Sequence, residues 1–248
     1  MKNSLNKSQI ERFSRQLVLK NIGAKGQKKI LSSKILIVGV GGLGCPAAEN
    51  LVRAGVGTIG LIDNDIVNLS NIHRQCLFNS KDIKKSKVNV AAKKLKEINP
   101  LVKIKTYNSK LDEKNIEKII KDYELIIDGS DNFKTKFLVN DYCLKLKKKL
   151  VTGAISKFDG HIFTFDFKDK KTASLKNFYQ EKEITDDILN CEFEGVLGTT
   201  ATIVGTTQAN EALKMLIEIG QNLKNQILVI DLLNLNFRKV KFKKNKII

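Results

Sequence analysis

The sequence predicts an α/β protein with a doubly wound, Rossmann-like sheet that is parallel in its first half and carries an antiparallel extension. Three observations support this prediction. Short apolar runs of strand length alternate with amphipathic stretches of helix length as far as Gly153. A glycine-rich loop joins the first of these strands to the helix that follows it. After Gly153, residues 160–167 alternate between polar and apolar side chains, which is typical of an antiparallel strand.

Hydrophobic periodicity assigns the elements of the first half in order. Residues 10–19 carry apolar side chains three and four apart and are expected to form one amphipathic helix, followed by a short helix near residues 26–31. Residues 34–39 form a continuous apolar run, as expected for a strand buried on both faces of a parallel sheet. The next elements are a helix at 45–54, a strand at 58–63, a helix at 84–98, a strand at 102–107, a helix at 113–121, a strand at 124–128, a helix at 133–147 and a strand at 149–153.

The second half of the chain has a different pattern. The polar stretch at about residues 168–195 has no firm periodicity and is expected to be a mobile loop. Residues 199–219 are helical and apolar, and two strands follow at 226–232 and 236–242. Because no linker rich in Pro, Gly or Ser divides these elements, we expect a single domain over residues 1–248.

Composition excludes several classes of protein. A hydrophobic fraction of 42% is too high for a mostly disordered chain. No apolar run approaches the roughly 20 residues that a membrane-spanning helix needs, and the charged N-terminus has no apolar signal core. The four cysteines lie far apart without a Cys-x-x-Cys pair, which argues against a disulfide framework. We therefore expect a protein of the reducing cytoplasm with no membrane partner.

The net charge of +18 raises the question of a nucleic-acid partner. Only five of the 44 basic residues are arginine, and the lysines are scattered over nearly every segment without interleaved tryptophan. Phosphate and base recognition favours the planar arginine fork, so we interpret the lysines as a solvated surface and do not expect nucleic acid to be a partner. The positive field would still attract an anion such as ATP or a small acidic protein.

The glycine loop at residues 39–44 matches the pattern G-x-G-x-x-G after a buried strand and at the start of a helix. Backbone N–H groups at such a helix N-terminus bind phosphate, and Asp63 ends the next strand, where a carboxylate accepts hydrogen bonds from ribose hydroxyls. The unit predicts an adenine-nucleotide site with a core at about residues 32–153. The glycine loop and Asp63 do not distinguish a site for NAD from a site for ATP.

Four further residues favour nucleotidyl transfer over hydride transfer. Arg74 can hold the negative charge that spreads over a pentavalent phosphorus centre, and Lys87 begins a helix near the same edge of the sheet. Asp131 and Asn132 follow a buried strand at its carboxyl end, where a carboxylate is a natural Mg²⁺ ligand. Each residue has a simpler interpretation, since Arg74 and Lys87 could be surface charges and Asp131 a helix cap. Because the strand ends near these residues converge, the residues together indicate a functional site.

Taken in order, these motifs resemble those of the ThiF/MoeB family, adenylyltransferases that activate ubiquitin-like sulfur-carrier proteins and are relatives of the ubiquitin-activating enzymes. The resemblance covers nearly the whole chain. The parts that carry it are residues 12–16, 39–44, 54–57, 63–65, 69–75, Lys87 and 131–132.

The resemblance implies an ATP site. In it the glycine loop binds ATP, Asp63 holds the ribose, Asn71, Arg74 and Lys87 meet the phosphates, and Mg²⁺ binds Asp131. The nucleotide-binding residues that it implies are Gly39, Gly41, Gly42, Gly44, Asp63, Asp65, Ser70, Asn71, Arg74, Lys87, Asp131 and Asn132.

The implied reaction is adenylylation of the C-terminal glycine of a ThiS- or MoaD-like carrier protein, with release of pyrophosphate. The sequence leaves open whether the carrier serves thiamine or molybdopterin biosynthesis. Arg15 is implied to reach into the site of the neighbouring subunit, so that a homodimer is part of the catalytic design. Cys191 is implied to take part in sulfur transfer onto the carrier. The catalytic residues of this scheme are Arg15, Arg74, Lys87, Asp131 and Cys191.

The chain departs from the family in one respect. Many members hold a structural zinc with two Cys-x-x-Cys pairs, and this sequence has neither pair, so we predict no zinc. A rhodanese-like extension is also missing, which leads us to expect a separate sulfur-donor protein.

Three alternatives stay open at this point. An NAD-dependent oxidoreductase would use the glycine loop but leave Arg74, Lys87 and Asp131 unexplained. A non-catalytic scaffold could bind nucleotide or RNA through its lysines. A tRNA-modifying dehydratase relative would share the family motifs, but Cys191 and the N-terminal segment with Arg15 favour a carrier-activating enzyme.

Overall fold

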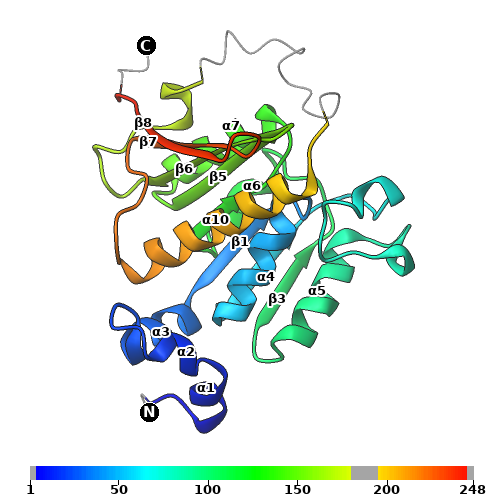
Figure 1. Cartoon of the computed structure of the whole chain (residues 1–248), viewed down its shortest axis with the longest axis vertical. Helices are drawn as coiled ribbons and strands as arrows, with labels where there is room; N and C mark the ends of the chain where they lie inside the picture. The colour runs from blue at the N-terminus through cyan, green and yellow to red at the C-terminus, as the bar shows by residue number, and fades with distance from the viewer. Residues whose placement is uncertain (1–3, 180–194, 245–248) are drawn as a thin grey trace.

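The computed structural model describes residues 4–179 and 195–244, and one eight-stranded sheet runs through them. The strand order is β3-β2-β1-β4-β5-β6-β7-β8 (Figure 1). Neighbours from β3 to β5 are parallel, and those from β5 to β8 are antiparallel, so the predicted fold class is confirmed. The strands are β1 (Lys34–Val38), β2 (Thr58–Ile62), β3 (Lys103–Tyr107), β4 (Leu125–Asp128), β5 (Lys149–Ser156), β6 (Asp159–Asp166), β7 (Gln226–Asp231) and β8 (Asn236–Lys241).

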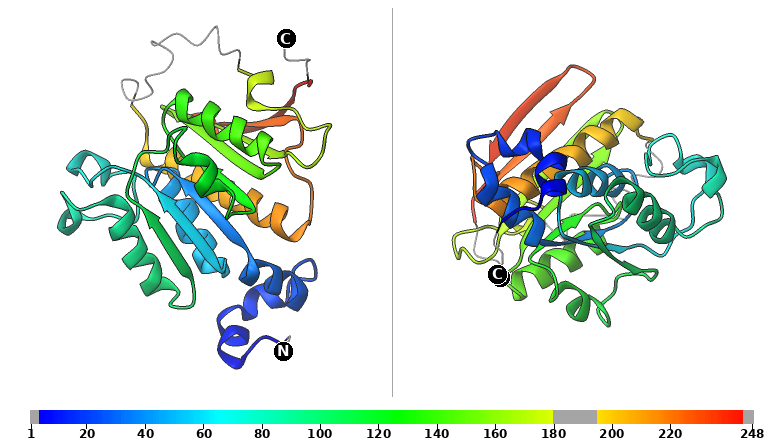
Figure 2. Two further views of the ribbon diagram at one scale, coloured as in Figure 1. Left: turned by 180° about the vertical axis from the view of Figure 1, so that it is seen from behind. Right: turned by 90° about the horizontal axis from the view of Figure 1, so that it is seen from below.

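Helices cover both faces of the sheet. Helices α4 (Gly44–Ala54), α5 (Lys87–Ile98) and α10 (Gly198–Ile217) lie on the face towards the viewer in Figure 1. Helices α6 (Ile116–Ile120) and α7 (Phe133–Lys145) lie on the opposite face, seen from behind in Figure 2. Helices α1 (Lys7–Arg12), α2 (Ser14–Leu17) and α3 (Gly23–Ser32) form a group at the lower end of the molecule in Figure 1. This is the three-layer arrangement expected of a doubly wound fold.

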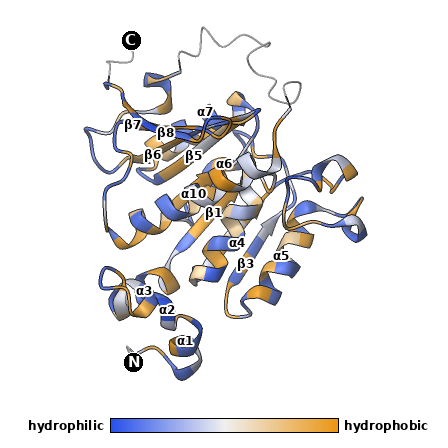
Figure 3. Ribbon diagram, in the orientation of Figure 1, coloured by the Kyte–Doolittle hydropathy of each residue, from blue (hydrophilic) through white to orange (hydrophobic). Residues whose placement is uncertain are grey.

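The central strand shows why continuous apolar runs form this sheet. Successive side chains of a strand point to opposite faces. Ile35 and Ile37 therefore join the hydrophobic core under α4, α5 and α10, while Leu36 and Val38 join the core under α6 and α7. The covering helices need only one apolar face, and hydrophobic and hydrophilic residues alternate along α5 and α10 in Figure 3.

The prediction of one helix over residues 10–19 was wrong, because α1 and α2 are separate short helices divided by Phe13. The Phe13 side chain is 1% exposed and packs on Gly55, where a Cβ atom would lie 2.6 Å from its Cζ atom. The Arg12 guanidinium donates a hydrogen bond to the Ile98 carbonyl at 3.0 Å. These tertiary contacts break the helix that local periodicity alone would continue.

The segment expected to be a mobile loop is in part packed. Residues 168–179 include the short helix η3 (Leu175–Asn177), and Ala173 and Leu175 are buried. The Leu175 N–H donates to the Asn140 side chain at 3.0 Å, and the Phe178 ring lies 5.1 Å from that of Phe163. Residues 180–194 lie outside the described part of the chain. In the part that is described, no helix is both long and apolar enough to cross a membrane.

The strand order creates a topological switch point. From β1 the chain moves outward through β2 and β3 on one side, then crosses to β4 on the other side of β1. The loops after β1 and β4 therefore leave the carboxyl edge of the sheet in opposite directions. Open α/β sheets bind ligands in the crevice at this point.

Candidate functional site

The glycine loop occupies the switch point after β1, so the four predicted glycines Gly39, Gly41, Gly42 and Gly44 lie together. Gly39 adopts a φ of +83°, which favours glycine, and a Cβ atom on it would lie 3.0 Å from the Gly129 carbonyl oxygen. A Cβ atom on Gly44 would lie 1.9 Å from the Gly39 carbonyl oxygen. The turn is therefore too tight for a side chain at Gly39 or Gly44, and it leads directly into the N-terminus of α4, which favours an anion.

Asp63 follows β2 and is in contact with the glycine loop. Its Oδ2 atom accepts a hydrogen bond from the Val40 N–H at 2.7 Å, and its Oδ1 atom accepts one from the Asp65 N–H at 2.8 Å. The side chain is partly exposed, so its remaining lone pairs can accept hydrogen bonds from ribose hydroxyls. The structure thus places Asp63 beside the glycine loop, as the sequence predicts.

Lys87 lies at the start of α5 and forms an ion pair with Asp65. The Lys87 Nζ atom is 3.0 Å from the Asp65 Oδ2 atom, and the Lys87 N–H donates to the Asp65 carbonyl at 3.0 Å. The Lys87 side chain is 6% exposed, whereas that of Asp65 is 58% exposed. A nearly buried ammonium thus has one solvated partner, which an incoming phosphate could replace.

The short helix η1 (Leu69–Asn71) and the turn after it bring Arg74 to the loop. The aliphatic part of Arg74 lies against Gly42, because a Cβ atom on Gly42 would be 3.6 Å from the Arg74 Cγ atom. The Arg74 Nη1 atom donates to the Ser70 carbonyl at 2.9 Å and lies 2.7 Å from the His73 Nε2 atom. The Asn71 side chain accepts from the Asn68 N–H at 3.2 Å and caps η1. Arg74 therefore lies at one rim of the glycine loop, and it is bonded to Ser70 of η1, the helix that also contains Asn71.

The loop after β4 provides the opposite rim. Asn132 caps α7, because its Oδ1 atom accepts from the Thr135 N–H at 2.9 Å, and its Nδ2 atom donates to the Asp131 Oδ1 atom at 3.1 Å. The helix cap is thus Asn132, which leaves the exposed Asp131 carboxylate without a capping role. Gly129 of the same loop touches the glycine loop, since its Cβ position lies 3.1 Å from the Gly44 nitrogen.

Sequence reasoning missed a buried polar cluster below this loop. Asp128 is 0% exposed, and its carboxylate accepts hydrogen bonds from Ser130, Thr152 and Lys136. Its backbone carbonyl accepts from the Gln208 Nε2 atom at 2.9 Å. The available signal was a carboxylate at the end of an otherwise apolar strand, because a buried charge requires partners.

Arg15 does not lie with the other predicted residues. It is exposed on α2, which is held at the C-terminal end of α4 by Phe13 and by the bond from Gln16 Nε2 to the Ala54 carbonyl at 3.3 Å. The glycine loop is at the N-terminal end of the same helix. The 11 residues of α4 correspond to about 16 Å of helix between them.

Cys191, the predicted sulfur-transfer residue, lies outside the described residues. Burial raises the pKa of the Cys45 and Cys143 thiols far above their usual range. Partial desolvation and the nearby Glu49 carboxylate raise the pKa of Cys76 to about 11. These three thiols are therefore protonated at neutral pH and are not activated nucleophiles.

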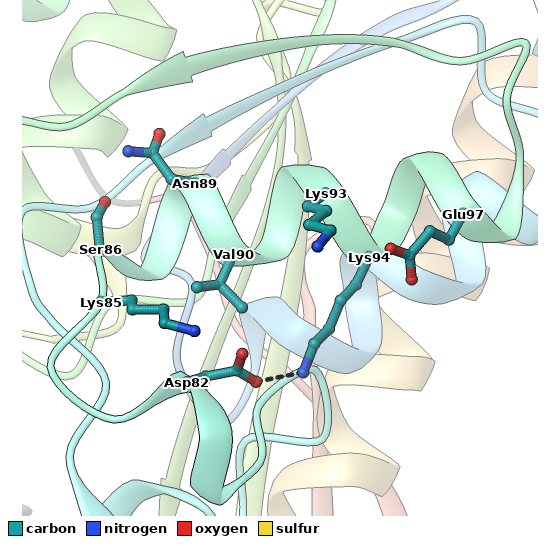
Figure 4. Close-up of a pocket in the computed structure, with 8 residues that line it drawn as sticks. All are labelled: Asp82, Lys85, Ser86, Asn89, Val90, Lys93, Lys94 and Glu97. Atoms are coloured by element: carbon teal, nitrogen blue, oxygen red, sulfur yellow. Dashed lines mark hydrogen bonds and ion pairs between the residues drawn. The ribbon is translucent and has the colours of Figure 1, made fainter.

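Two surface pockets lie beside α5, away from the glycine loop. One of about 610 Å³ is lined by both acidic and basic side chains, including the Asp82–Lys94 ion pair drawn in Figure 4. The other, of about 490 Å³, shares Lys94 and Glu97 with it and is also lined by Cys76. Neither pocket is lined by a residue predicted to bind the nucleotide.

A nucleoside triphosphate with Mg²⁺ fits the residues around the glycine loop. The tight turn leaves room for backbone to approach phosphate, and Arg74 and Lys87 supply positive charge beside it. Mg²⁺ is usually bound by one or two carboxylates together with phosphate oxygens and water, so the exposed Asp131 carboxylate suits it. Over residues 4–179 and 195–244, no group of three or more His, Cys, Asp or Glu side chains could hold a metal.

The chain is similar to relatives of known sequence over nearly its whole length. A model of the ThiF family matches residues 13–247. A sulfur carrier protein adenylyltransferase of Thermus thermophilus is 37% identical over 96% of this chain and 89% of its own length. A probable molybdopterin-synthase adenylyltransferase of Gracilaria tenuistipitata var. liui is 39% identical over 96% of this chain, and a probable adenylyltransferase/sulfurtransferase MoeZ of Mycobacterium tuberculosis is 34% identical over 98% of it. The chain spans 66% and 62% of the lengths of these two proteins.

Solved structures agree with the fold. E. coli MccB with ATP has a TM-score of 0.82 at 20% identity, over 95% of this chain and 73% of that one. E. coli MccB with MccA-N7isoASN has a TM-score of 0.83 at 19% identity, over 98% of this chain and 74% of that one. Since the family model spans nearly the whole sequence and the Thermus relative is 37% identical over 96% of it, the protein belongs to the ThiF family.

Proposed function

We propose that the protein adenylylates the C-terminal glycine of a ubiquitin-like sulfur-carrier protein of the ThiS or MoaD type and releases pyrophosphate. The observation that carries the proposal is the convergence of Asp63, Arg74, Lys87 and the Asp131 loop around one glycine turn in a ThiF-family chain. The names of the relatives support it, because they describe adenylyltransferases of sulfur-carrier protein and of molybdopterin synthase. A role in thiamine or molybdopterin biosynthesis follows from the same proposal.

The proposed reaction needs positioning and charge neutralisation more than acid–base chemistry. An oxygen of the carrier's terminal carboxylate attacks the α-phosphorus of ATP. The bond from that phosphorus to the bridging oxygen of the β-phosphate breaks, and pyrophosphate leaves with the electron pair. The carboxylate is already ionised at neutral pH, so no general base is needed. The enzyme gains most by stabilising the negative charge that spreads over the phosphorus oxygens.

Each side chain of the site has a role in this scheme. The glycine loop and the N-terminus of α4 hold phosphate oxygens through backbone N–H groups. Asp63 accepts hydrogen bonds from the ribose, and Arg74 and Lys87 neutralise phosphate charge, for which Lys87 exchanges its bond to Asp65 for a phosphate oxygen. Mg²⁺ held by Asp131 would add positive charge at the phosphates. The NAD-dependent oxidoreductase alternative gives no role to Arg74, Lys87 or Asp131.

Asp131→Ala is expected to lower carrier-dependent exchange of labelled pyrophosphate into ATP by about 100-fold or more, because the metal loses its carboxylate. Asp131 is exposed, so the variant should unfold at the temperature of the wild type. The matched control is Asp122→Ala, which removes an exposed carboxylate that lies 3.5 Å from the Lys105 ammonium. Exchange at the wild-type rate by Asp131→Ala would refute the Mg²⁺ role. Absence of exchange by the wild type with every Gly-Gly carrier tested would refute the proposed function.

The proposal includes a homodimer in which Arg15 acts on the partner's site. Arg15 lies beyond the far end of α4 from its own glycine loop, so an action within one subunit does not agree with its position. In an isologous two-fold dimer the same surface of each subunit contacts the other subunit, so each Arg15 can reach the site of its partner.

Mixing variants tests this arrangement. Arg15→Ala and Asp131→Ala should each be inactive alone, and co-expression should restore about a quarter of the wild-type exchange rate, because half of the dimers are mixed and each has one intact site. The control is co-expression of Arg74→Ala with Asp131→Ala. Both residues belong to the site of their own subunit, so each site of a mixed dimer lacks one of them and no exchange should be restored. No recovery from the first mixture would contradict action across the interface.

Cys191 is proposed to act after adenylylation, in sulfur transfer to the carrier. Cys191→Ser should keep pyrophosphate exchange within about twofold of the wild type and reduce the yield of carrier thiocarboxylate, measured by mass spectrometry with a sulfur donor present. Cys76→Ser is the control, because its thiol is protonated at neutral pH. A normal thiocarboxylate yield from Cys191→Ser would remove this residue from the mechanism.

A further inference from the structure

Lys136 is a nearly buried lysine that the proposed mechanism does not use. It lies on α7 with 5% of its surface exposed, and its Nζ atom donates to the Asp128 Oδ2 atom at 3.2 Å and to the Gly153 carbonyl at 2.6 Å. The ammonium therefore ties α7 to the carboxyl end of β4 and to the middle of β5. A buried charge lowers the stability of the fold unless it is fully paired. The groups that the Lys136 ammonium contacts therefore have to explain why a lysine is buried here.

The carboxylate that receives Lys136 also holds the loop above it. The Asp128 Oδ1 atom accepts from the Ser130 N–H at 3.0 Å and from the Ser130 hydroxyl at 2.6 Å. The Oδ2 atom accepts from the Thr152 hydroxyl at 2.5 Å as well as from Lys136. One oxygen is thus fixed by the sheet and α7, and the other fixes the start of the loop that contains Asp131.

The same loop is in contact with the glycine loop. The Cβ position of Gly39 lies 3.0 Å from the Gly129 carbonyl oxygen, and that of Gly129 lies 3.1 Å from the Gly44 nitrogen. Gln208 of α10 also holds the residue before this loop, because its side-chain amide donates to the Asp128 carbonyl at 2.9 Å. A shift of Asp128 would therefore move the loop with Asp131 relative to the turn that holds phosphate.

We propose that Lys136 is a positioning residue, which holds the Asp128 carboxylate so that the Gly129–Asn132 loop presents Asp131 to the metal of a bound Mg²⁺–ATP complex. This inference rests on the proposed function. Outer residues that orient a metal ligand commonly alter metal affinity by 10- to 100-fold when they are changed. A merely structural lysine would affect the stability of the fold without affecting ATP binding in a metal-dependent way.

The test is calorimetric titration of the full-length protein with ATP, once with Mg²⁺ and once with EDTA. Lys136→Met should weaken ATP binding about 10- to 100-fold in Mg²⁺ and by less than about threefold in EDTA. Lys136→Arg should restore most of the Mg²⁺-dependent affinity, because a guanidinium can donate to both Asp128 and Gly153. Thermal unfolding without nucleotide measures the structural effect of each variant separately.

The matched control is Lys148→Met. Lys148 is also partly buried and donates to two carbonyls, those of Lys121 at 2.8 Å and Tyr123 at 2.6 Å, outside the loops after β1 and β4. This variant should lower the unfolding temperature and leave ATP binding in Mg²⁺ unchanged. Should Lys136→Met fail to fold, the double variant Asp128→Asn with Lys136→Met removes both charges and leaves no unpaired buried ion. It should fold and show the same Mg²⁺-dependent loss.

Two results would overturn the inference. One is wild-type ATP affinity in Mg²⁺ for Lys136→Met or for the double variant, and the other is an equal loss with Mg²⁺ and with EDTA. Failure of the wild-type protein itself to bind ATP would instead refute the proposed function, so the two failures are distinguishable.

Discussion

The close approach of two backbone loops, one after β1 and one after β4, is the constraint on which the rest of the site depends. The turn is so tight that a Cβ atom on Gly44 would lie 1.9 Å from the Gly39 carbonyl oxygen. Because the only side chains of this turn, those of Val40 and Leu43, are apolar, charge has to come from neighbouring elements. In the proposed site, Arg74 supplies positive charge from the turn after η1 and Lys87 from the start of α5, and the proposed Mg²⁺ ligand Asp131 lies in the loop after β4. The strand order brings these segments to one edge of the sheet.

The local pattern of apolar and polar residues was enough to predict most of the helices and strands of the fold. The run from Ile35 to Val38 is apolar because both of its faces are buried, and α5 ends at Ile98 because Asn99 precedes Pro100. The N-terminal helix was mispredicted because its periodicity continues through Phe13, whose burial against Gly55 is set by a residue 42 positions further along the chain. Such a contact leaves no local pattern that a sequence window could detect.

The site was predictable in part for the same reason. The glycines, Asp63, Arg74 and Lys87 occur in short motifs next to strands, and strand ends converge in this fold class, so their meeting followed from the topology. The Asp128 cluster was missed because its partners Lys136, Thr152 and Gln208 lie 8, 24 and 80 residues away in sequence. The bonds of Lys87 to Asp65 and of Arg74 to Ser70 were not predictable either. A sequence motif indicates which ligand a side chain binds, but it does not indicate which protein groups that side chain contacts when the ligand is absent.

We propose that the site around the glycine loop serves a triphosphate undergoing nucleotidyl transfer and not a nicotinamide. The most direct test is competitive titration of the wild-type protein and Arg74→Ala with Mg²⁺–ATP and with NADH. ATP is expected to bind the wild type, NADH is expected not to displace it, and loss of the guanidinium is expected to weaken ATP binding about tenfold or more. Displacement of ATP by NADH, or equal ATP affinity of the two proteins, would contradict the proposed nucleotidyl transfer.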